Sequence, residues 1–293
     1  MAQKKIHVHW LLLLVVFLTF SSCRNSLPDE TDREIRMVYT EWTESVAITF
    51  LSAVLLEEKM DYSVELKLTD VALAYQEVAE GKSDIFADAW LPETHQQYVE
   101  KHEEEIERIG IIYPEARIGF VVPGYSELVT INDLKEYPHT LIGIEESAGV
   151  MQKARMAIEN YDLTNTLLNL SEEEMVQHLE DSIKRRENIV VTGWEPHWTF
   201  ARYELRFLQD PDQVFGKKEN IYSIGRIGIG QEHPHAIRFF ERLQLTEKQL
   251  NRLVYFVRLS EDPREGVKNW IKENEYIVNQ WVKNLKPERK KIM

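Results

Sequence analysis

Strand-like and helix-like patterns alternate along this chain from about residue 34 onward. Polar and apolar residues alternate in "YSVELKL" (62–68), at the two-residue period of a strand, whereas "ESVAITFLSAVLLEEKM" (44–60) has the apolar pattern of an amphipathic helix. A polar helix is expected over 95–110, and another begins at the capping box of Ser171 with Glu174. Alternation of this kind predicts α/β layers with largely parallel sheets.

The middle of the chain has a set of strands of its own, which predicts a second lobe inserted into the first. We expect residues 34–119 to form the first part of lobe 1 and residues 120–222 to form lobe 2. Residues 223–293 would then complete lobe 1 and add the C-terminal helices. The chain would cross between lobes near 121–125 and near 221–230. Two crossing strands form a hinge that suits closure around a ligand, so the ligand cleft is expected between the lobes.

The N-terminus has the pattern of a secretion signal. Lys4 and Lys5 precede the apolar run "WLLLLVVFLTF" (10–20), which is too short to span a membrane comfortably. Small residues then lead to Cys23, the only cysteine, in a pattern that resembles the lipobox of bacterial lipoproteins. We therefore expect a signal peptide over 1–22, lipidation of Cys23, a polar tether over 23–33, and an extracytoplasmic body anchored by lipid. The alternative is an ordinary signal peptide followed by an incidental cysteine.

The charge of the chain excludes one class of partner. Its formal net charge is −14, and the acidic residues are spread along the sequence. Nucleic-acid binding needs a basic face that neutralises phosphates, so we expect no nucleic acid as a partner.

Tryptophans follow predicted strands at three places. Trp42, Trp90 and Trp194 each stand where a strand ends, and ligands of open α/β sheets bind beyond the carboxyl ends of strands. Indole faces attract a quaternary ammonium, which has a diffuse positive charge and no N–H to donate. Each tryptophan taken singly is as readily a core residue, but their common position predicts a cage formed when the lobes close.

A different chemistry is expected at the other end of such a ligand. The turn before Gly149 opens a helix, whose free N–H groups and dipole suit a carboxylate, and His95 could add a side-chain N–H. The alternatives are plain turn geometry at Gly149 and a surface or capping role for His95. In "GWEPHW" (193–198), His197 is assigned to structural hydrogen bonding and Trp198 to packing.

Four stretches resemble one known family. "GWEPHW" (193–198), "DAWLPETHQQY" (88–98), "GIEESAGV" (143–150) and "VYTEWTES" (38–45) are similar to the substrate-binding proteins of glycine betaine (OpuA/ProU-type, OpuAC-like) ABC importers. The resemblance spans roughly residues 35 to 260, and the first two motifs are highly specific together.

The resemblance implies a two-lobed, type II-like periplasmic-binding-protein fold without catalysis, cofactor or metal, which delivers its ligand to a permease and its ATPase. It also implies particular ligand contacts. These are a cage of Trp42, Trp90 and Trp194, and a carboxylate site formed by the backbone of Gly149 and Val150 with the His95 side chain. The chain departs from the family where Glu145 and Glu146 precede the helix. Two acids there could weaken a carboxylate site or favour a more cationic ligand.

Other classes of function stay open at this point. A secreted enzyme or an interaction module acting on a choline-like compound is the alternative, although the chain has no G-x-S-x-G elbow, H-E-x-x-H motif or Walker loop. The sequence does not distinguish glycine betaine, proline betaine, carnitine and choline as ligands, nor does it indicate which membrane holds the anchor.

Overall fold

The computed structural model describes residues 33–285, so the expected signal peptide, Cys23 and nearly all of the tether lie outside the described residues. The strands are β1 (Glu34–Tyr39), β2 (Ser63–Leu68), β3 (Ile85–Leu91), β4 (Ile106–Pro123), β5 (Leu141–Ile142), β6 (Leu167–Leu168), β7 (Val191–Glu195), β8 (Leu205–Phe207) and β9 (Glu219–Arg226). The helices are α1 (Thr43–Met60), α2 (Val71–Ala79), α3 (Gln96–Lys101), α4 (Gly149–Asn160), α5 (Glu172–Arg185), α6 (Trp198–Arg202), α7 (Ile229–Glu232), α8 (Pro234–Arg242), α9 (Glu247–Leu259), α10 (Pro263–Glu273) and α11 (Glu275–Trp281), with a 3-10 helix at Ile131–Glu136.

The strands follow the order β2-β1-β3-β9-β4-β7-β5-β6, and β8 pairs with β4. In lobe 1, β1 lies parallel to β2 and β3, while β9 lies antiparallel to β3 and β4. In lobe 2, β5 lies parallel to β6 and β7, while β4 is antiparallel to β7 and β8. The expectation of largely parallel sheets is therefore wrong. The strands nearest the lobe junction are antiparallel because β4 and its partner β9 run in opposite directions between the two parts.

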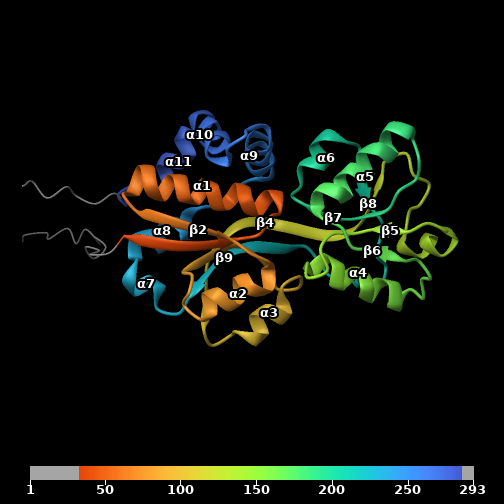
Figure 1. Ribbon diagram of the computed structural model, residues 1–293, viewed down its shortest axis with the longest axis horizontal. Helices are drawn as coiled ribbons and strands as arrows, with labels where there is room; N and C mark the ends of the chain where they lie inside the picture. Colours follow the sequence, from red (N-terminus) through yellow and green to blue (C-terminus); the bar gives the residue numbers. More distant parts are fainter. Residues whose placement is uncertain (1–32, 286–293) are drawn as a thin grey trace, which may run out of the picture.

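The long strand β4 runs from one lobe into the other (Figure 1). It pairs with β9 up to Ala116 and with β7 from Arg117 onward. The chain returns to lobe 1 before β9, which begins at Glu219. The expected boundaries at residues 120 and 223 stay predictions, but the change of pairing partner shows that the chain passes between the lobes along extended backbone.

The polar helix expected over 95–110 is shorter than predicted. Helix α3 ends at Lys101, and β4 begins at Ile106. Three consecutive glutamates, 103–105, follow the end of α3. The segment after them instead hydrogen bonds to β9, because Ile106 is in register with Arg226.

Helix α1 lies between the lobe 1 sheet and the C-terminal helices α9 and α10 (Figure 1). Its side chains Ile48, Leu51 and Leu55 are fully buried, since the helix is covered on both sides. The capping box expected at Ser171 and Glu174 is confirmed at the start of α5, and α9 begins with a second one. Burial of this kind holds the N-terminal end of α1 in a fixed position at the lobe junction.

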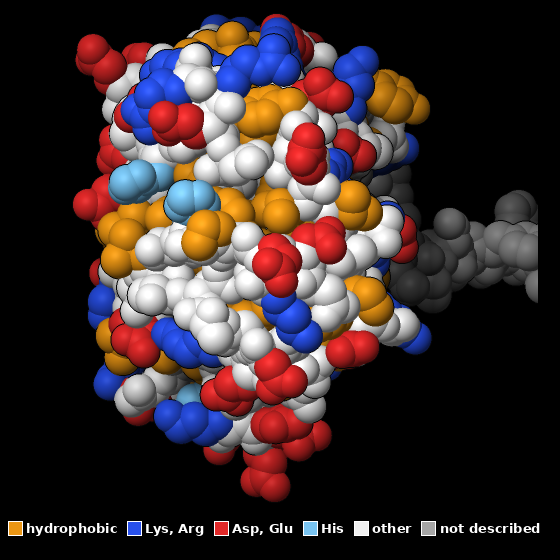
Figure 2. All heavy atoms as spheres, turned by 90° about the vertical axis from the view of Figure 1, so that its right-hand side faces the viewer, with side chains coloured by type: hydrophobic (Ala, Val, Ile, Leu, Met, Phe, Trp, Pro, Cys, Tyr) orange, Lys and Arg blue, Asp and Glu red, His pale blue; other side chains and the backbone are white. Residues whose placement is uncertain are grey.

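The end of lobe 2 that faces away from lobe 1 carries acidic and basic side chains interspersed with each other (Figure 2). This face shows no broad basic surface of the kind that nucleic-acid binding requires. Within residues 33–285, no helix has both the length and the apolar character needed to cross a bilayer.

Candidate functional site

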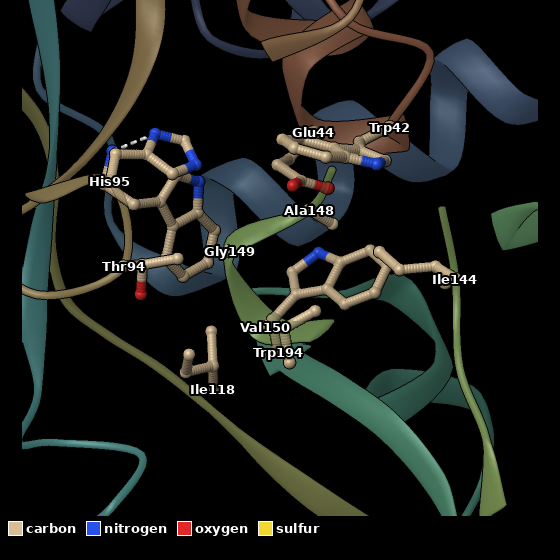
Figure 3. Close-up of a pocket in the computed structure, with 11 residues that line it drawn as sticks. Trp42, Glu44, Thr94, His95, Ile118, Ile144, Ala148, Gly149, Val150 and Trp194 are labelled. Atoms are coloured by element: carbon tan, nitrogen blue, oxygen red, sulfur yellow. Dashed lines mark hydrogen bonds between the residues drawn. The ribbon is translucent and has the colours of Figure 1, made fainter. Parts of the chain in front are cut away.

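A pocket lies between the two lobes. All six predicted ligand-binding residues line it, namely Trp42, Trp90, His95, Gly149, Val150 and Trp194 (Figure 3). Ile118 and Ile144 add apolar surface, and Glu44, Thr94 and Ala148 complete the lining. The structure therefore brings together residues that are more than 150 positions apart in the sequence.

Three different elements place the indoles. Trp42 occupies the N-cap position of α1, Trp90 is the next-to-last residue of β3, and Trp194 lies near the end of β7 in lobe 2. The three side chains are buried, with 3–7% of their surface exposed, but they border the same cavity. Lobe 1 thus contributes two rings and lobe 2 contributes one.

Hydrogen bonds to acids fix two of the rings. The Trp90 indole N–H donates to Asp88 Oδ1 at 2.9 Å, and the Trp42 N–H donates to Glu145 Oε2 at 3.1 Å. Burial raises the pKa of Asp88 to about 7. Burial, followed by a hydrogen bond with Glu41, raises the pKa of Glu145 to about 7 as well. Because the ring edges are held in this way, the π faces are free to contact a ligand.

His95 is a buried, neutral donor at one side of the pocket. Only 1% of its surface is exposed, it forms no side-chain capping bond, and burial lowers its pKa to about 3. His95 does occupy the N-cap position of α3, but its buried side chain makes no capping bond, so the alternative of a surface residue is wrong. Its Nδ1 accepts a hydrogen bond from the Trp90 backbone N–H at 3.1 Å, so the proton of the neutral ring is on Nε2. The imidazole can offer this N–H to a ligand without carrying a charge.

Gly149 lies where the two lobes approach each other closely. It begins α4, and a Cβ added there would lie 2.4 Å from Thr94 Cγ2 and 2.5 Å from Thr94 O. Only glycine lets the start of this helix pack against the loop that carries His95. The first amides of an α-helix have no partner within the helix, so those of Gly149 and Val150 are available beside the pocket.

Glu44 is a residue of the pocket that the sequence interpretation missed. It lies in the first turn of α1 and is 2% exposed. Burial first, and then the nearby carboxylates of Asp88 and Glu172, raise the pKa of Glu44 well above its ordinary value. Because an acid in the first turn of a helix is a common stabilising feature, the sequence did not single out Glu44 as a pocket residue. Its position two residues after Trp42, on a helix that starts beside the cage, was the available signal.

His197 and Trp198 of the "GWEPHW" motif lie outside the pocket lining and contact other parts of the fold. His197 Nε2 lies 3.0 Å from Glu172 Oε1, and its Nδ1 lies 2.6 Å from Thr199 Oγ1. Trp198 packs under the Arg258 guanidinium, whose Cζ is 3.9 Å from the ring centroid. The structural role expected for His197 and the packing role expected for Trp198 are confirmed.

The two lobes also hydrogen bond directly around the pocket. Glu172 Oε2 in lobe 2 accepts from the Thr43 backbone N–H of lobe 1 at 3.0 Å. The Tyr98 hydroxyl donates to the Ser147 carbonyl oxygen at 2.7 Å on the opposite side. These contacts hold the lobes in a closed arrangement.

Two α/β lobes joined by extended strands, with a buried pocket between them, define the class of two-lobed substrate-binding proteins. The family model described as the substrate binding domain of ABC-type glycine betaine transport systems matches residues 33–273. The chain belongs to this family, and the predicted fold and family are confirmed.

Individual relatives agree with this assignment. The chain is 34% identical to lactococcal OpuAC in its closed conformation with glycine betaine, and the match covers 86% of this chain and all of that one at a TM-score of 0.82. It is 28% identical to the glycine betaine, L-proline binding protein ProX of Borrelia burgdorferi, over 85% and 96% of the two chains, at a TM-score of 0.80. It is also 33% identical over 174 residues to the glycine betaine/carnitine transport binding protein GbuC of Listeria monocytogenes. That alignment covers 58% of this chain and spans 57% of the length of GbuC.

Proposed function

We propose that this protein captures a quaternary ammonium solute, glycine betaine or a close relative, outside the cytoplasm and delivers it to the permease of an ABC importer. The observation that carries the proposal is the arrangement of three indoles, from two lobes, around one pocket. The methylated ammonium would lie among Trp42, Trp90 and Trp194. The family, and the glycine betaine bound by lactococcal OpuAC, support this ligand class.

The energetics require contacts at both ends of the ligand. A cation–π contact contributes roughly 0.5–2 kcal/mol, so three give only a few kcal/mol. Micromolar binding needs about 8 kcal/mol. The amides of Gly149 and Val150 and the His95 Nε2–H would supply the remainder by binding a polar group at the other end. A ligand held by both lobes makes closure depend on the ligand.

Calorimetric titration of the purified protein with glycine betaine, choline, carnitine and proline tests this proposal. We expect micromolar-range binding of at least one quaternary ammonium compound and none of proline at the same concentrations. Mass spectrometry of the recovered ligand should show it unchanged, as transport requires and an enzyme would not allow. Failure of every methylated ammonium to bind would overturn the proposal.

Delivery to the membrane forms a second part of the proposal. The thiol of Cys23 would be lipidated and residues 1–22 removed, leaving a lipid-anchored body beside its permease and ATPase. The small residues before Cys23 support this. Replacement Cys23→Ser should move the protein from the membrane fraction to the soluble fraction while ligand affinity stays unchanged. Membrane retention of this variant would contradict the anchor.

A further inference from the structure

The Glu44 carboxylate faces the pocket between two of the indoles. Figure 3 shows its oxygens between the rings of Trp42 and Trp194, directed into the space that the ligand would occupy. The side chain is 2% exposed, and Oε2 has no hydrogen-bond partner within residues 33–285. The Trp194 N–H points toward Glu44 and favours its ionised form, but no hydrogen bond of good geometry joins the two. This oxygen is therefore a buried acceptor directed at an open cavity.

The groups around Glu44 make its negative charge costly while the pocket is empty. Asp88 on β3 and Glu172 on α5 are both acidic, and both raise the pKa of Glu44. Glu172 has partners of its own, because it accepts from Thr43 and contacts His197. Asp88 Oδ1 accepts from Trp90, whereas Asp88 Oδ2, like Glu44 Oε2, has no hydrogen-bond partner within residues 33–285. Among the described residues that line the pocket, none is a lysine or an arginine. A buried carboxylate without a compensating cation takes up a proton instead.

We propose that Glu44 selects ligands by net charge, so that the pocket prefers a quaternary ammonium alcohol of the choline class to a betaine. The inference rests on the proposed function and assigns the ligand class of the same pocket. A choline-class cation brings a positive charge that no group of its own compensates, and the ionised Glu44 carboxylate supplies the missing partner inside the cage. A betaine brings a carboxylate into a pocket that already holds an acid and is lined by no lysine or arginine, so only the neutral His95 and backbone amides can receive it.

The two ligand classes should differ in proton exchange. When a choline-class cation enters, Glu44 releases its proton to solvent and pairs with the ammonium. When a betaine enters, its own carboxylate balances the ammonium and Glu44 keeps its proton. Cation binding should therefore strengthen as the pH rises through the pKa of Glu44, whereas betaine binding should change little or weaken. His95 stays neutral in this range and does not contribute to the difference. Asp88 and Glu145 also have raised pKa values, so the proton release that disappears in Glu44→Gln is the part that belongs to Glu44.

Calorimetry on the purified full chain, with choline chloride and with glycine betaine in two buffers of different ionisation enthalpy, tests the proposal. We expect the unaltered protein to bind choline at least tenfold more tightly than glycine betaine and to release protons only with choline. The isosteric replacement Glu44→Gln should weaken choline at least tenfold and change glycine betaine by less than threefold. Glu146→Gln is the matched control, because this acid of the adjacent loop is exposed and pairs with Arg155.

Several outcomes would overturn the proposal while leaving the proposed function intact. These are tighter binding of glycine betaine by the unaltered protein, equal losses of both ligands in Glu44→Gln, or the same loss in Glu146→Gln. Binding of neither ligand by the unaltered protein would instead remove the proposed function itself. If Glu44→Gln does not unfold cooperatively, the difference in proton release between the two ligands decides the question on the unaltered protein alone.

Discussion

The indole N–H of Trp42, at the start of α1 in lobe 1, donates a 3.1 Å hydrogen bond to Glu145 Oε2 in lobe 2. One side chain thus forms a wall of the pocket with its face and joins the lobes with its edge. Glu145 Oε2 therefore contacts the Trp42 indole and not the amides of Gly149 and Val150. Closure and ligand contact are consequently coupled through the same ring.

Loss of this bond should weaken ligand binding. In Glu145→Ala, Trp42 loses its acceptor in lobe 2, and above the raised pKa of Glu145 a hydrogen bond to the ionised carboxylate is worth about 1.5–3 kcal/mol. We expect roughly tenfold weaker binding or more, measured by calorimetric titration, with the melting temperature of the ligand-free protein little changed. The exposed neighbour Glu146→Ala provides the control and should bind normally. Unaltered affinity in Glu145→Ala would show that the bond does not contribute to closure.

Replacing a tryptophan of the cage should lower ligand affinity, whereas replacing a tryptophan outside the pocket should not. Trp42→Ala, Trp90→Ala and Trp194→Ala should each weaken binding at least tenfold, because each removes a cation–π contact and leaves a gap in the wall. Trp198→Phe keeps a ring beneath Arg258 outside the pocket, so it should lower stability slightly and leave affinity unchanged. Quenching of tryptophan fluorescence on titration provides the measurement. Equal losses in the Trp198 variant and the cage variants would argue against a localised cage.

Gly149 should be essential for closure and dispensable for the folding of each lobe. A Cβ at this position would lie 2.4 Å from Thr94 Cγ2 in the other lobe, so Gly149→Ala must hold the lobes apart. We expect a loss of affinity of at least tenfold, whereas the far-ultraviolet circular dichroism stays unchanged. Gly230→Ala, where an added Cβ meets no atom within 4 Å, should bind as the unaltered protein does. Normal binding by Gly149→Ala would mean that the ligand does not require the close approach at Thr94.

The buried acids should make the ligand-free protein less stable as the pH rises. Burial raises the pKa of Asp88 from its ordinary value of 3.8 to about 7, so between these values the folded state holds a proton that the unfolded chain has released. The stabilisation from this proton is complete near pH 4 and is lost as the pH approaches 7. It amounts to a few kcal/mol, since one pKa unit corresponds to about 1.4 kcal/mol.

The isosteric variant Asp88→Asn isolates this effect, because an asparagine oxygen can still accept from Trp90. Its melting temperature should match that of the unaltered protein near pH 4 and exceed it by several degrees near pH 7. Asp181→Asn, which changes an acid on the surface of α5, should show no such gain. A difference between Asp88→Asn and the unaltered protein that does not change with pH would contradict the buried-proton account.

The pattern of the sequence predicted much of the candidate site. Trp42, Trp90 and Trp194 follow predicted strands, and parallel strands deliver their carboxyl ends to one edge of a sheet. The glycine that opens α4 was found in the same way. The structure brings these residues to one pocket, and the sequence could indicate this because strand ends depend on local order along the chain, which the period of apolar residues reveals.

Glu44 and Glu145 could not be assigned in this way. Glu44 looks like an ordinary acid of a first helical turn, and its importance comes from the Asp88 and Glu172 carboxylates that other elements bring beside it. Glu145 was expected to act near a carboxylate site, yet it accepts a bond from an indole 103 positions earlier in the chain. The electrostatic environment of a side chain is a property of its neighbours in space, so local patterns do not contain it.

The sequence by itself determined the alternation of strands and helices, the three strand ends that carry tryptophan, and the family. Tertiary structure decided that β4 pairs antiparallel with β7 and β9 and that α3 ends at Lys101. It also decided that the Glu44 carboxylate lies among the indoles. The division has a physical reason. Backbone preferences and apolar periodicity act over a few neighbouring residues, whereas pairing partners, desolvation and charge–charge interactions depend on which distant segments the fold brings together.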